Sequence, residues 1–329
     1  MRHAGTWIPA LIVALLGASG AIVGCYGRDL ARARDAAGRS SVIIDTGAGP
    51  IEYAERGEGR PLLSIHGAGG GFDQGLANAA ELVGDGFRVI APSRFGYLRT
   101  PVPSDASPAA QADAHAALLS SRGIHRAIVL GVSAGARSAV ELALRRPDLV
   151  ERLLLIVPAL HDAGHPPATD ASRGSQFAFS LVNAGADFAW WIAEKLAPSM
   201  LVRFIGVPPA LLAGAPAGER DRVMRIVRSI APLSLRFPGI NIDSAPCPTE
   251  LPLERIAAPT LIISARDDLF ATATAAEFAA GKIRDARLVL YDAGGHLLVG
   301  HSAEAQAAVR AFLDSPAATP RRVLSAAEG

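Results

Sequence analysis

The feature that most constrains this 329-residue chain is a short run around Ser133. An apolar stretch, Ala127 to Leu130, leads into Gly131-Val132-Ser133-Ala134-Gly135, and a stretch with helical spacing follows up to Arg146. This is the G-x-S-x-G pattern between a strand and a helix, where it holds a serine on a sharp turn at the top of a sheet. Glycines are needed there because side chains would collide with neighbouring backbone. The run therefore predicts a nucleophilic Ser133 on an α/β sheet; the alternative is an ordinary glycine-rich loop.

Composition narrows the class of protein further. The chain is 50% hydrophobic and 19% charged, which suits a globular enzyme with a large core. Its net charge of +1 lacks the excess of basic residues that is typical of nucleic-acid-binding proteins, so we expect no nucleic-acid partner. The two cysteines, Cys25 and Cys247, are too few for a disulfide framework. Neither lies near a histidine or cysteine at zinc-ligand spacing, and we expect neither a metal nor a cofactor.

The first 25 residues are expected to lie outside the catalytic domain. A short positive start and the apolar run from Trp7 to Val23 fit a secretory signal. Ile22-Val23-Gly24-Cys25 also resembles a lipobox, in which the cysteine becomes lipid-modified. Trp7 to Tyr26 has about the 20 residues that an uncleaved membrane anchor needs, although the arginines that follow weaken an N-in orientation. We therefore expect membrane association or export, as a periplasmic lipoprotein or an anchored protein; a buried core helix is a third reading.

The rest of the chain divides into segments according to how strand-like and helical patterns alternate. After a linker over 26–40, apolar strand-like runs alternate with helical patterns over 41–158 and again over 251–314, which predicts a mostly parallel sheet with helices on both faces. This alternation of strand-like and helical patterns is lost over 159–250, which we expect to form an inserted helical cap. Residues 315–329 read as a flexible tail. The aromatic residues of the cap either line an acyl pocket or pack the cap on the core: Phe177, Phe179, Phe188, Trp190 and Trp191.

A serine nucleophile needs a general base, and His296 is the candidate. It follows a predicted strand, Arg287 to Tyr291, on a loop with two glycines that can reach the top of the sheet. Its place after an acidic candidate gives the order serine, aspartate, histidine that this chemistry expects. An imidazole with a pKa near ~6.5 can take up and return a proton near neutrality.

The acid that orients the base is Asp267 or Asp268, directly after the strand Leu261 to Ser264. Its carboxylate would hold the imidazole tautomer and stabilise the imidazolium. Adjacent residues at a strand end point in different directions, so only one of the two can serve. We expect the other to be solvated or paired with Arg266.

Acyl transfer also needs backbone N–H donors for the oxyanion. One is expected from Ala134, after the nucleophile, and the other from Ala68 in a loop that continues as Gly69-Gly70-Gly71. A phosphate loop is the alternative, but no Lys-Ser/Thr pair follows the glycines and no dinucleotide fingerprint is present. His66, at the start of this loop, is expected to be structural.

Five segments in order resemble the α/β-hydrolase superfamily over about residues 41–314. They are His66-Gly67-Ala68-Gly69-Gly70, Arg94-Phe95-Gly96-Tyr97, Gly131-Val132-Ser133-Ala134-Gly135, Pro259-Thr260-Leu261-Ile262-Ile263 with Asp267-Asp268, and Gly294-Gly295-His296. The resemblance implies Ser133 as nucleophile, His296 as base and Asp268 as acid, with Ala265 where the family usually has glycine. It also implies that the helical insertion is a lid that shapes the substrate pocket.

Within the superfamily, the chain is most similar to lidded esterases, lactonases and hydrolases of meta-cleavage products. Ser133 argues against the dehalogenases and epoxide hydrolases, which use an aspartate nucleophile. The carbon–carbon hydrolases usually carry asparagine before the nucleophile and tryptophan after the histidine, where this chain has Val132 and Leu297. We expect a serine hydrolase that cleaves a small apolar carboxylic ester through an acyl-enzyme. Carbon–carbon hydrolysis of a meta-cleavage-type diketone and a catalytically silent binding protein are the alternatives.

Overall fold

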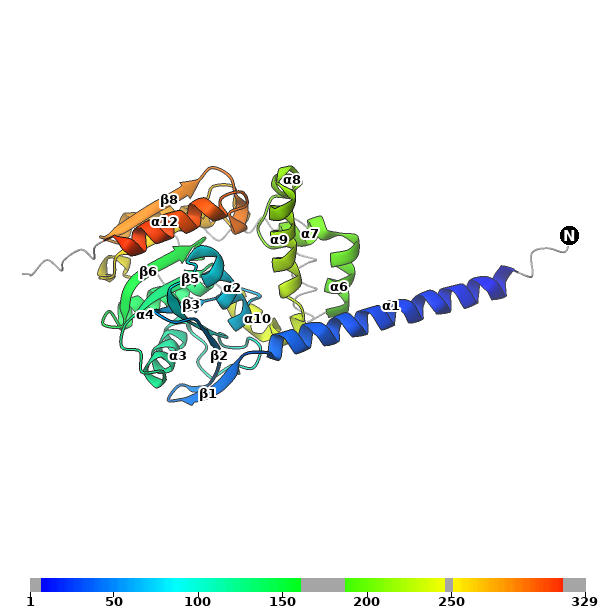
Figure 1. Cartoon of the computed structure of the whole chain (residues 1–329), viewed down its shortest axis with the longest axis horizontal. Helices are drawn as coiled ribbons and strands as arrows, with labels where there is room; N and C mark the ends of the chain where they lie inside the picture. The colour runs from blue at the N-terminus through cyan, green and yellow to red at the C-terminus, as the bar shows by residue number, and fades with distance from the viewer. Residues whose placement is uncertain (1–6, 161–186, 246–250, 316–329) are drawn as a thin grey trace, which may run out of the picture.

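The computed structural model describes residues 7–160, 187–245 and 251–315, with only the backbone of residues 7–16 and 18 (Figure 1). Eight strands form one sheet in the order β1-β2-β4-β3-β5-β6-β7-β8. The strands are β1 (Val42–Thr46), β2 (Gly49–Arg56), β3 (Arg60–Ile65), β4 (Phe87–Pro92), β5 (Ala127–Val132), β6 (Val150–Ile156), β7 (Thr260–Ala265) and β8 (Ala286–Tyr291). β1 pairs antiparallel with β2 and β2 with β4, and the other pairs are parallel. The predicted α/β class with a mostly parallel sheet is confirmed.

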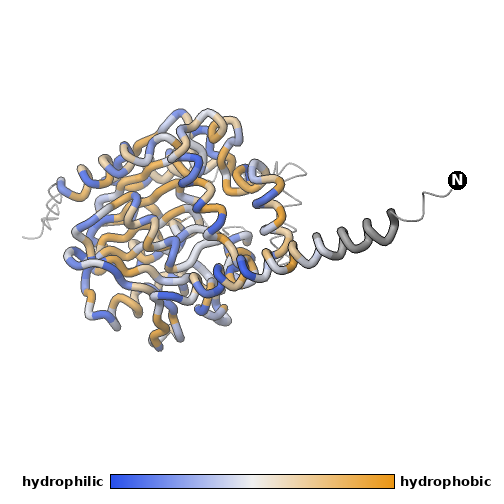
Figure 2. Tube along the Cα trace, turned by 45° about the vertical axis from the view of Figure 1, so that its right-hand side comes forward, coloured by the Kyte–Doolittle hydropathy of each residue, from blue (hydrophilic) through white to orange (hydrophobic). Residues whose placement is uncertain are grey.

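Helices cover both faces of the sheet because successive strand residues point to opposite sides. Leu63, Val129 and Leu153 join the core under one set of helices, while Ile128 and Leu154 face the other set. The first set is α3 (Pro108–Ser121), α4 (Gly135–Arg145) and α11 (Thr272–Lys282), and the second is α2 (Phe72–Leu82) and α12 (Ser302–Asp314). Figure 2 shows the apolar trace concentrated in the strands between these layers.

Short helices lie between β6 and β7 in the stretch expected to form the cap. They are α6 (Asp187–Leu196), α7 (Pro198–Phe204), α8 (Pro209–Gly214), α9 (Ala217–Ser229) and α10 (Phe237–Ser244). These helices pack in a hydrophobic cluster that also includes Tyr97 and Val299 of the sheet domain. Within it, Trp190 packs edge-on against Phe204 with the ring centroids 5.6 Å apart. Phe177 and Phe179, two of the aromatic residues singled out above, lie outside the described residues.

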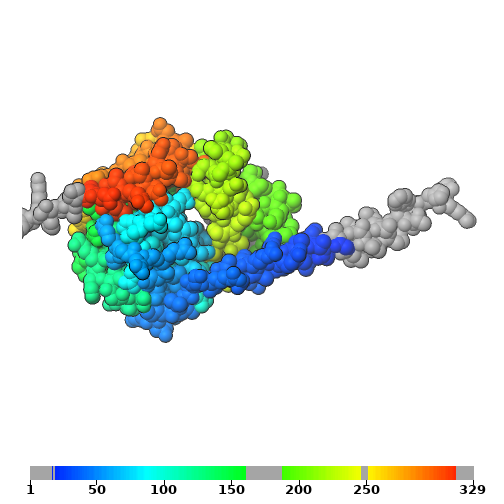
Figure 3. All heavy atoms as spheres, viewed as in Figure 1, coloured from blue at the N-terminus to red at the C-terminus, as the bar shows by residue number. Residues whose placement is uncertain are grey.

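The N-terminal helix α1 runs without a break from Trp7 to Gly38, so most of the expected linker is helical. Its sequence after Cys25 is rich in alanine and arginine, which favour helix. Tyr26 meets the rings of Phe188 and Trp191 at 5.1 and 5.8 Å, and this contact fixes α1 beside α6 (Figures 1 and 3). Among the residues whose side chains are described, no helix is both long enough and apolar enough to cross a membrane.

Candidate active site

Ser133 lies on the turn between β5 and α4 with a left-handed backbone, φ 51°. The two glycines of the turn are required by close packing. A Cβ on Gly131 would come within 2.6 Å of the Ala139 side chain, and one on Gly135 within 2.5 Å of the His66 carbonyl oxygen. The turn therefore carries a strained serine between two positions that admit no side chain.

The structure brings Ser133, His296 and Asp268 into one hydrogen-bonded row. The His296 Nε2 atom lies 2.9 Å from Ser133 Oγ, and His296 Nδ1 lies 2.8 Å from Asp268 Oδ2. The Asp268 side chain is fully buried and that of His296 is 10% exposed. With the Nδ1 proton donated to the carboxylate, Nε2 is free to accept the serine proton, which is the geometry that a general base requires.

Asp268 is held by neighbours that the sequence did not reveal. The Phe270 amide donates to its Oδ1 at 2.9 Å, and the Thr272 hydroxyl donates to its Oδ2. The hydroxyls of Thr272 and Ser264 are 3.0 Å apart, and both residues are buried. Hydrogen bonds to a carboxylate fix its orientation. No spacing in the chain marks Thr272 as a partner of Asp268, because the contact depends on how α11 follows β7.

Asp267 is half-buried, and it pairs with the histidine loop rather than with Arg266. Its Oδ1 accepts the Gly295 amide at 2.7 Å and thus braces the loop that carries His296. Arg266 instead bonds to Glu277 at 3.0 Å and approaches Asp292 at 3.7 Å. The two adjacent aspartates therefore hold the same loop, one through the imidazole and the other through the backbone.

The two amides expected to hold an oxyanion come from Ala134, directly after the nucleophile, and from Ala68 in a neighbouring loop. A Cβ on Gly67, the residue before Ala68, would come within 3.1 Å of the Ser133 Cβ, so the loop runs directly beside the serine. Among the described residues, neither the Ala68 nor the Ala134 amide donates a hydrogen bond. Unpaired donors beside a nucleophile are what an oxyanion hole offers.

His66 is used by the backbone around it. Its Nε2 accepts the Arg94 amide at 2.9 Å, and Nδ1 lies 2.7 Å from the Gly67 carbonyl oxygen. Burial and the nearby charge of Arg94 hold the pKa of His66 well below its usual value, so the ring is neutral. Both ring nitrogens are occupied, which fits the structural role expected of this residue.

The stretch between α7 and α8 also contacts the histidine loop. The carbonyl oxygen of Gly206 accepts the amides of His296 and Leu269, each at 3.1 Å. Phe270 packs edge-on against the His296 ring with the centroids 4.7 Å apart, and its side chain is 44% exposed. These contacts place an apolar side chain and the cap backbone directly beside the imidazole.

The two tryptophans of α6 pack within the protein rather than around Ser133. Trp190 is 3% exposed in the core of the cap. Trp191 faces α1, and its Nε1 donates to Asp29 at 2.9 Å. These two tryptophans therefore have a packing role and do not line an acyl pocket at Ser133.

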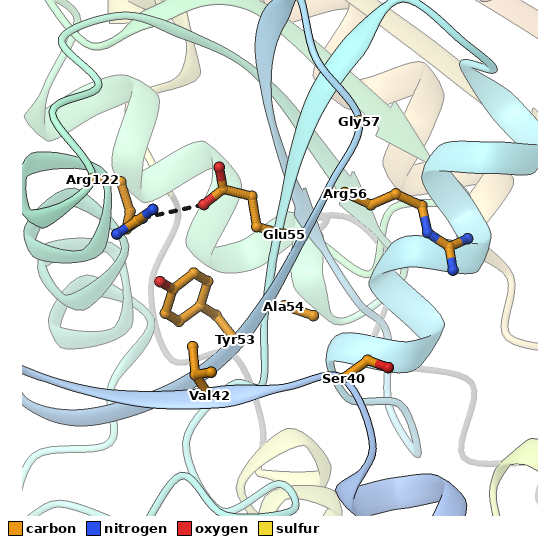
Figure 4. Close-up of a pocket in the computed structure, with 8 residues that line it drawn as sticks. All are labelled: Ser40, Val42, Tyr53, Ala54, Glu55, Arg56, Gly57 and Arg122. Atoms are coloured by element: carbon orange, nitrogen blue, oxygen red, sulfur yellow. Dashed lines mark hydrogen bonds and ion pairs between the residues drawn. The ribbon is translucent and has the colours of Figure 1, made fainter.

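A separate shallow pocket of about 430 Å³ lies at the β1 edge of the sheet (Figure 4). Its wall includes Tyr53, Glu55 and Arg122, and Arg122 bonds to Glu55 at 3.1 Å. The strands β2, β4 and β3 separate β1 from the nucleophile strand β5, so this pocket is not part of the Ser133 site. No group of three or more metal-ligating side chains is found in the described part of the chain.

Comparison with known proteins agrees with the fold. The model of the alpha/beta hydrolase family matches residues 62–311. A 2-hydroxy-6-oxo-6-phenylhexa-2,4-dienoate hydrolase of Comamonas testosteroni is 27% identical over 252 residues, which cover 75% of this chain and 84% of that protein.

Two solved structures are similar over most of the chain. An alpha/beta hydrolase fold protein from Nakamurella multipartita superposes with a TM-score of 0.65 at 27% identity, over 83% of this chain and 99% of that one. A thermophilic esterase from Thermogutta terrifontis superposes with a TM-score of 0.60 at 23% identity, over 83% and 97%, and shows the shared fold. The chain belongs to the alpha/beta hydrolase family.

Proposed function

We propose that the protein is a serine hydrolase that cleaves a small apolar carboxylic ester. The observation that carries this proposal is the hydrogen-bonded row at the nucleophile. The His296 ring lies 2.9 Å from Ser133 Oγ through one nitrogen and 2.8 Å from the Asp268 carboxylate through the other. A serine hydroxyl is a weak nucleophile until a base is placed to take its proton, and His296 is so placed.

The reaction would proceed in two steps. Ser133 Oγ attacks the ester carbonyl while His296 takes the serine proton, and the oxyanion that forms accepts from the Ala68 and Ala134 amides. The tetrahedral intermediate collapses, the alcohol leaves with the proton from His296, and the acyl group stays on Ser133. Water, deprotonated by His296, then attacks the acyl carbon and releases the acid and the free serine. Throughout, the Asp268 carboxylate accepts the hydrogen bond from His296 Nδ1–H.

An apolar substrate is supported by what surrounds the row. Phe270 stacks edge-on against His296, and Ile230 lies 3.4 Å from where a Cβ on Gly69 would stand. Apolar side chains of this kind suit an acyl or alcohol group without charge. No substrate-binding residue is assigned.

The direct test is labelling with a fluorophosphonate, followed by turnover of p-nitrophenyl esters of increasing chain length. Ser133→Ala is expected to abolish both, and Ser229→Ala, at an exposed serine of α9, is the matched control. Retained labelling in folded Ser133→Ala would show that the nucleophile is another residue. An unlabelled wild-type chain would favour the silent binding protein.

Carbon–carbon hydrolysis is the second candidate, because the relative from Comamonas testosteroni is named for a dienoate that is cleaved in this way. Rates on a short ester and on 2-hydroxy-6-oxo-6-phenylhexa-2,4-dienoate, measured side by side, separate the two. We expect the ester to be faster, since Val132 and Leu297 stand where the carbon–carbon hydrolases usually carry asparagine and tryptophan.

We also propose that residues 1–25 take the protein to a membrane or out of the cytoplasm. The support is the apolar sequence from Trp7 to Val23 and the lipobox-like residues that end at Cys25. Metabolic labelling with a radioactive fatty acid tests the lipid. Cys25→Ser should lose the label if the lipobox is used, and an unlabelled wild-type chain that still sediments with membranes would favour an uncleaved anchor.

A further inference from the structure

The loop of residues 66–71 is hydrogen-bonded on both sides of Ala68 while Ala68 itself is left open. The Gly67 amide donates to Gln74 Oε1 at 2.9 Å, and the Gly69 amide donates to the Tyr97 hydroxyl at 3.3 Å. A chain of glycines has no stiffness of its own, so the position of the Ala68 amide depends on these outside partners.

A buried arginine holds the first carbonyl of the loop. Arg94 is 5% exposed, and its Nε donates to the His66 carbonyl oxygen at 2.9 Å. The rest of its guanidinium forms a two-pronged ion pair with Asp243 in α10, at 2.7 and 2.6 Å. Burial by itself would lower the pKa of Arg94, but the charge of Asp243 outweighs it and raises the pKa overall. The grip on His66 therefore depends on a carboxylate that belongs to the inserted segment.

A second buried arginine, on the inserted segment itself, holds the last part of the loop. Arg236 immediately precedes α10 and is 1% exposed. Its Nη1 donates to the Gly70 carbonyl oxygen, and its Nη2 donates to Asp73 Oδ2 at 2.7 Å. A Cβ on Gly71 would come within 3.0 Å of this guanidinium, so the contact is close.

Tyr97 joins Asp243 of the inserted segment to the Gly69 amide of the loop. Its hydroxyl donates to Asp243 Oδ2 at 2.5 Å and accepts the Gly69 amide. A Cβ on Gly239 would come within 2.2 Å of the Tyr97 ring, which shows how tightly α10 lies on this ring. The segment from Arg236 to Asp243 is therefore seated directly on the partners of the Ala68 loop.

We propose that Arg236 and Asp243 are positioning residues for the oxyanion hole, so that seating of α10 on the core fixes the Ala68 amide where charge develops. This inference rests on the proposed serine-hydrolase function. Preorganised donors stabilise a transition state because they need not be reoriented during the reaction. Without the Asp243 carboxylate, the buried Arg94 guanidinium loses its counter-ion and is expected to turn away from the His66 carbonyl.

The test is Asp243→Asn in the full-length chain. We expect kcat on a p-nitrophenyl ester to fall about tenfold to a hundredfold, somewhat less than the 10²–10³-fold typical of deleting a whole oxyanion donor, with KM within about threefold. The Ki of a trifluoromethyl ketone, whose serine adduct carries an oxyanion, should rise by the same factor as kcat/KM falls. The pH profile should keep its shape because His296 and Asp268 are untouched. Arg236→Gln should behave alike, and Arg236→Lys should recover part of the loss.

Two variants make the result decisive. Glu194→Gln breaks an ion pair between α6 and Arg228 of α9, at 3.0 Å, and should keep the wild-type kcat. If Asp243→Asn does not fold, Tyr97→Phe removes only the hydroxyl that joins Asp243 to the Gly69 amide. It should lower kcat several-fold with KM retained.

The outcomes separate this inference from the proposed function. Folded variants with wild-type kcat and wild-type inhibitor affinity would overturn the positioning role while Ser133 still reacts with the fluorophosphonate. An unlabelled wild-type chain would overturn both. A fall in kcat/KM that comes from KM alone would also overturn the positioning role, because such a result would place these residues in substrate binding.

Discussion

The two adjacent aspartates at the end of β7 show how much one residue step decides. Asp268 Oδ2 meets the His296 ring at 2.8 Å, whereas Asp267 Oδ1 meets the backbone of Gly295 at 2.7 Å. Successive residues at the end of a strand point to different sides, so local spacing names only the pair, and the family resemblance is what singles out Asp268.

The different partners of the two aspartates predict that their substitution lowers kcat by different factors. In Asp268→Asn the imidazole is expected to lose its required tautomer, so kcat on a p-nitrophenyl ester should fall on the order of 10³–10⁴-fold. In Asp267→Asn the amide oxygen still accepts the Gly295 amide, and the fall should stay below about tenfold. Steady-state kinetics on both variants check this. Equal losses would show that the two carboxylates share one role.

His115 predicts a pH dependence of stability. It is fully buried beside Ser138, and burial lowers the pKa of this histidine from 6.5 to about 3. The unfolded chain therefore binds a proton at a pH where the folded chain does not. The stabilising effect of the neutral ring is complete above about pH 6.5 and is lost as the pH falls towards 3.

Urea denaturation of the wild-type chain and of His115→Gln at about pH 7 and pH 5 measures this effect. Because about 1.4 kcal/mol corresponds to one pKa unit, the wild-type chain should lose about 2 kcal/mol more than the variant over this range. Parallel losses in the two proteins would mean that His115 is protonated in the folded state.

At the scale of elements, the crossing of α4 over β3 depends on Gly135. A Cβ there would stand 2.5 Å from the His66 carbonyl oxygen and 2.7 Å from that of Ile65. Gly135→Ala should therefore force the helix off the strand and lower the free energy of unfolding by about 1–3 kcal/mol.

Gly218 in α9 is the matched control, because nothing lies within 4 Å of a Cβ built there. Gly218→Ala removes backbone freedom from the unfolded chain and should raise stability by about 0.5–1 kcal/mol. Chemical denaturation compares the two variants. An unchanged free energy of unfolding in Gly135→Ala would show that the helix can shift without loss of stability.

Most elements of the sheet domain were predictable because strand and helix differ in the period of their apolar residues. The apolar run from Phe87 to Ala91 predicts a strand, and it forms β4, Phe87–Pro92; the helical apolar spacing that starts at Pro108 predicts the helix that is α3. In the segment before β4, the helical spacing of apolar residues predicts a helix only from Asn78, whereas α2 begins at Phe72. The error arises because the glycine loop before α2 has no side-chain cap, so no residue type marks the boundary.

At the scale of the whole molecule, α1 is joined to α6 by side chains that lie far apart in sequence. Tyr26 contacts Phe188 and Trp191, and Asp29 accepts from Trp191 Nε1. None of these residues touches Ser133 or His296, so the contact bears on how the inserted helices are held rather than on the chemistry.

Tyr26→Ala should consequently loosen α6 without slowing hydrolysis. We expect faster hydrogen exchange in the backbone of α6 and a kcat within about twofold of wild type, since local opening depends on local contacts. Arg28→Ala, at an exposed position of the same helix whose side-chain hydrogen bonds stay within α1, is the control and should change neither quantity. Unchanged exchange in Tyr26→Ala would show that α1 does not hold α6.

The sequence by itself determined the hydrolase fold, and it singled out Ser133, His296 and a pair of aspartates, because each stands on a turn whose glycines or flanking strand mark it locally. Only the tertiary structure decided that Asp267 braces the Gly295 amide, that Thr272 supports Asp268, and that Arg94 and Arg236 bind the loop around Ala68. Those contacts join segments up to 166 residues apart, as between Arg236 and Gly70. Contacts of that kind depend on how packed layers bring side chains together, and neither spacing nor periodicity along a chain encodes that arrangement.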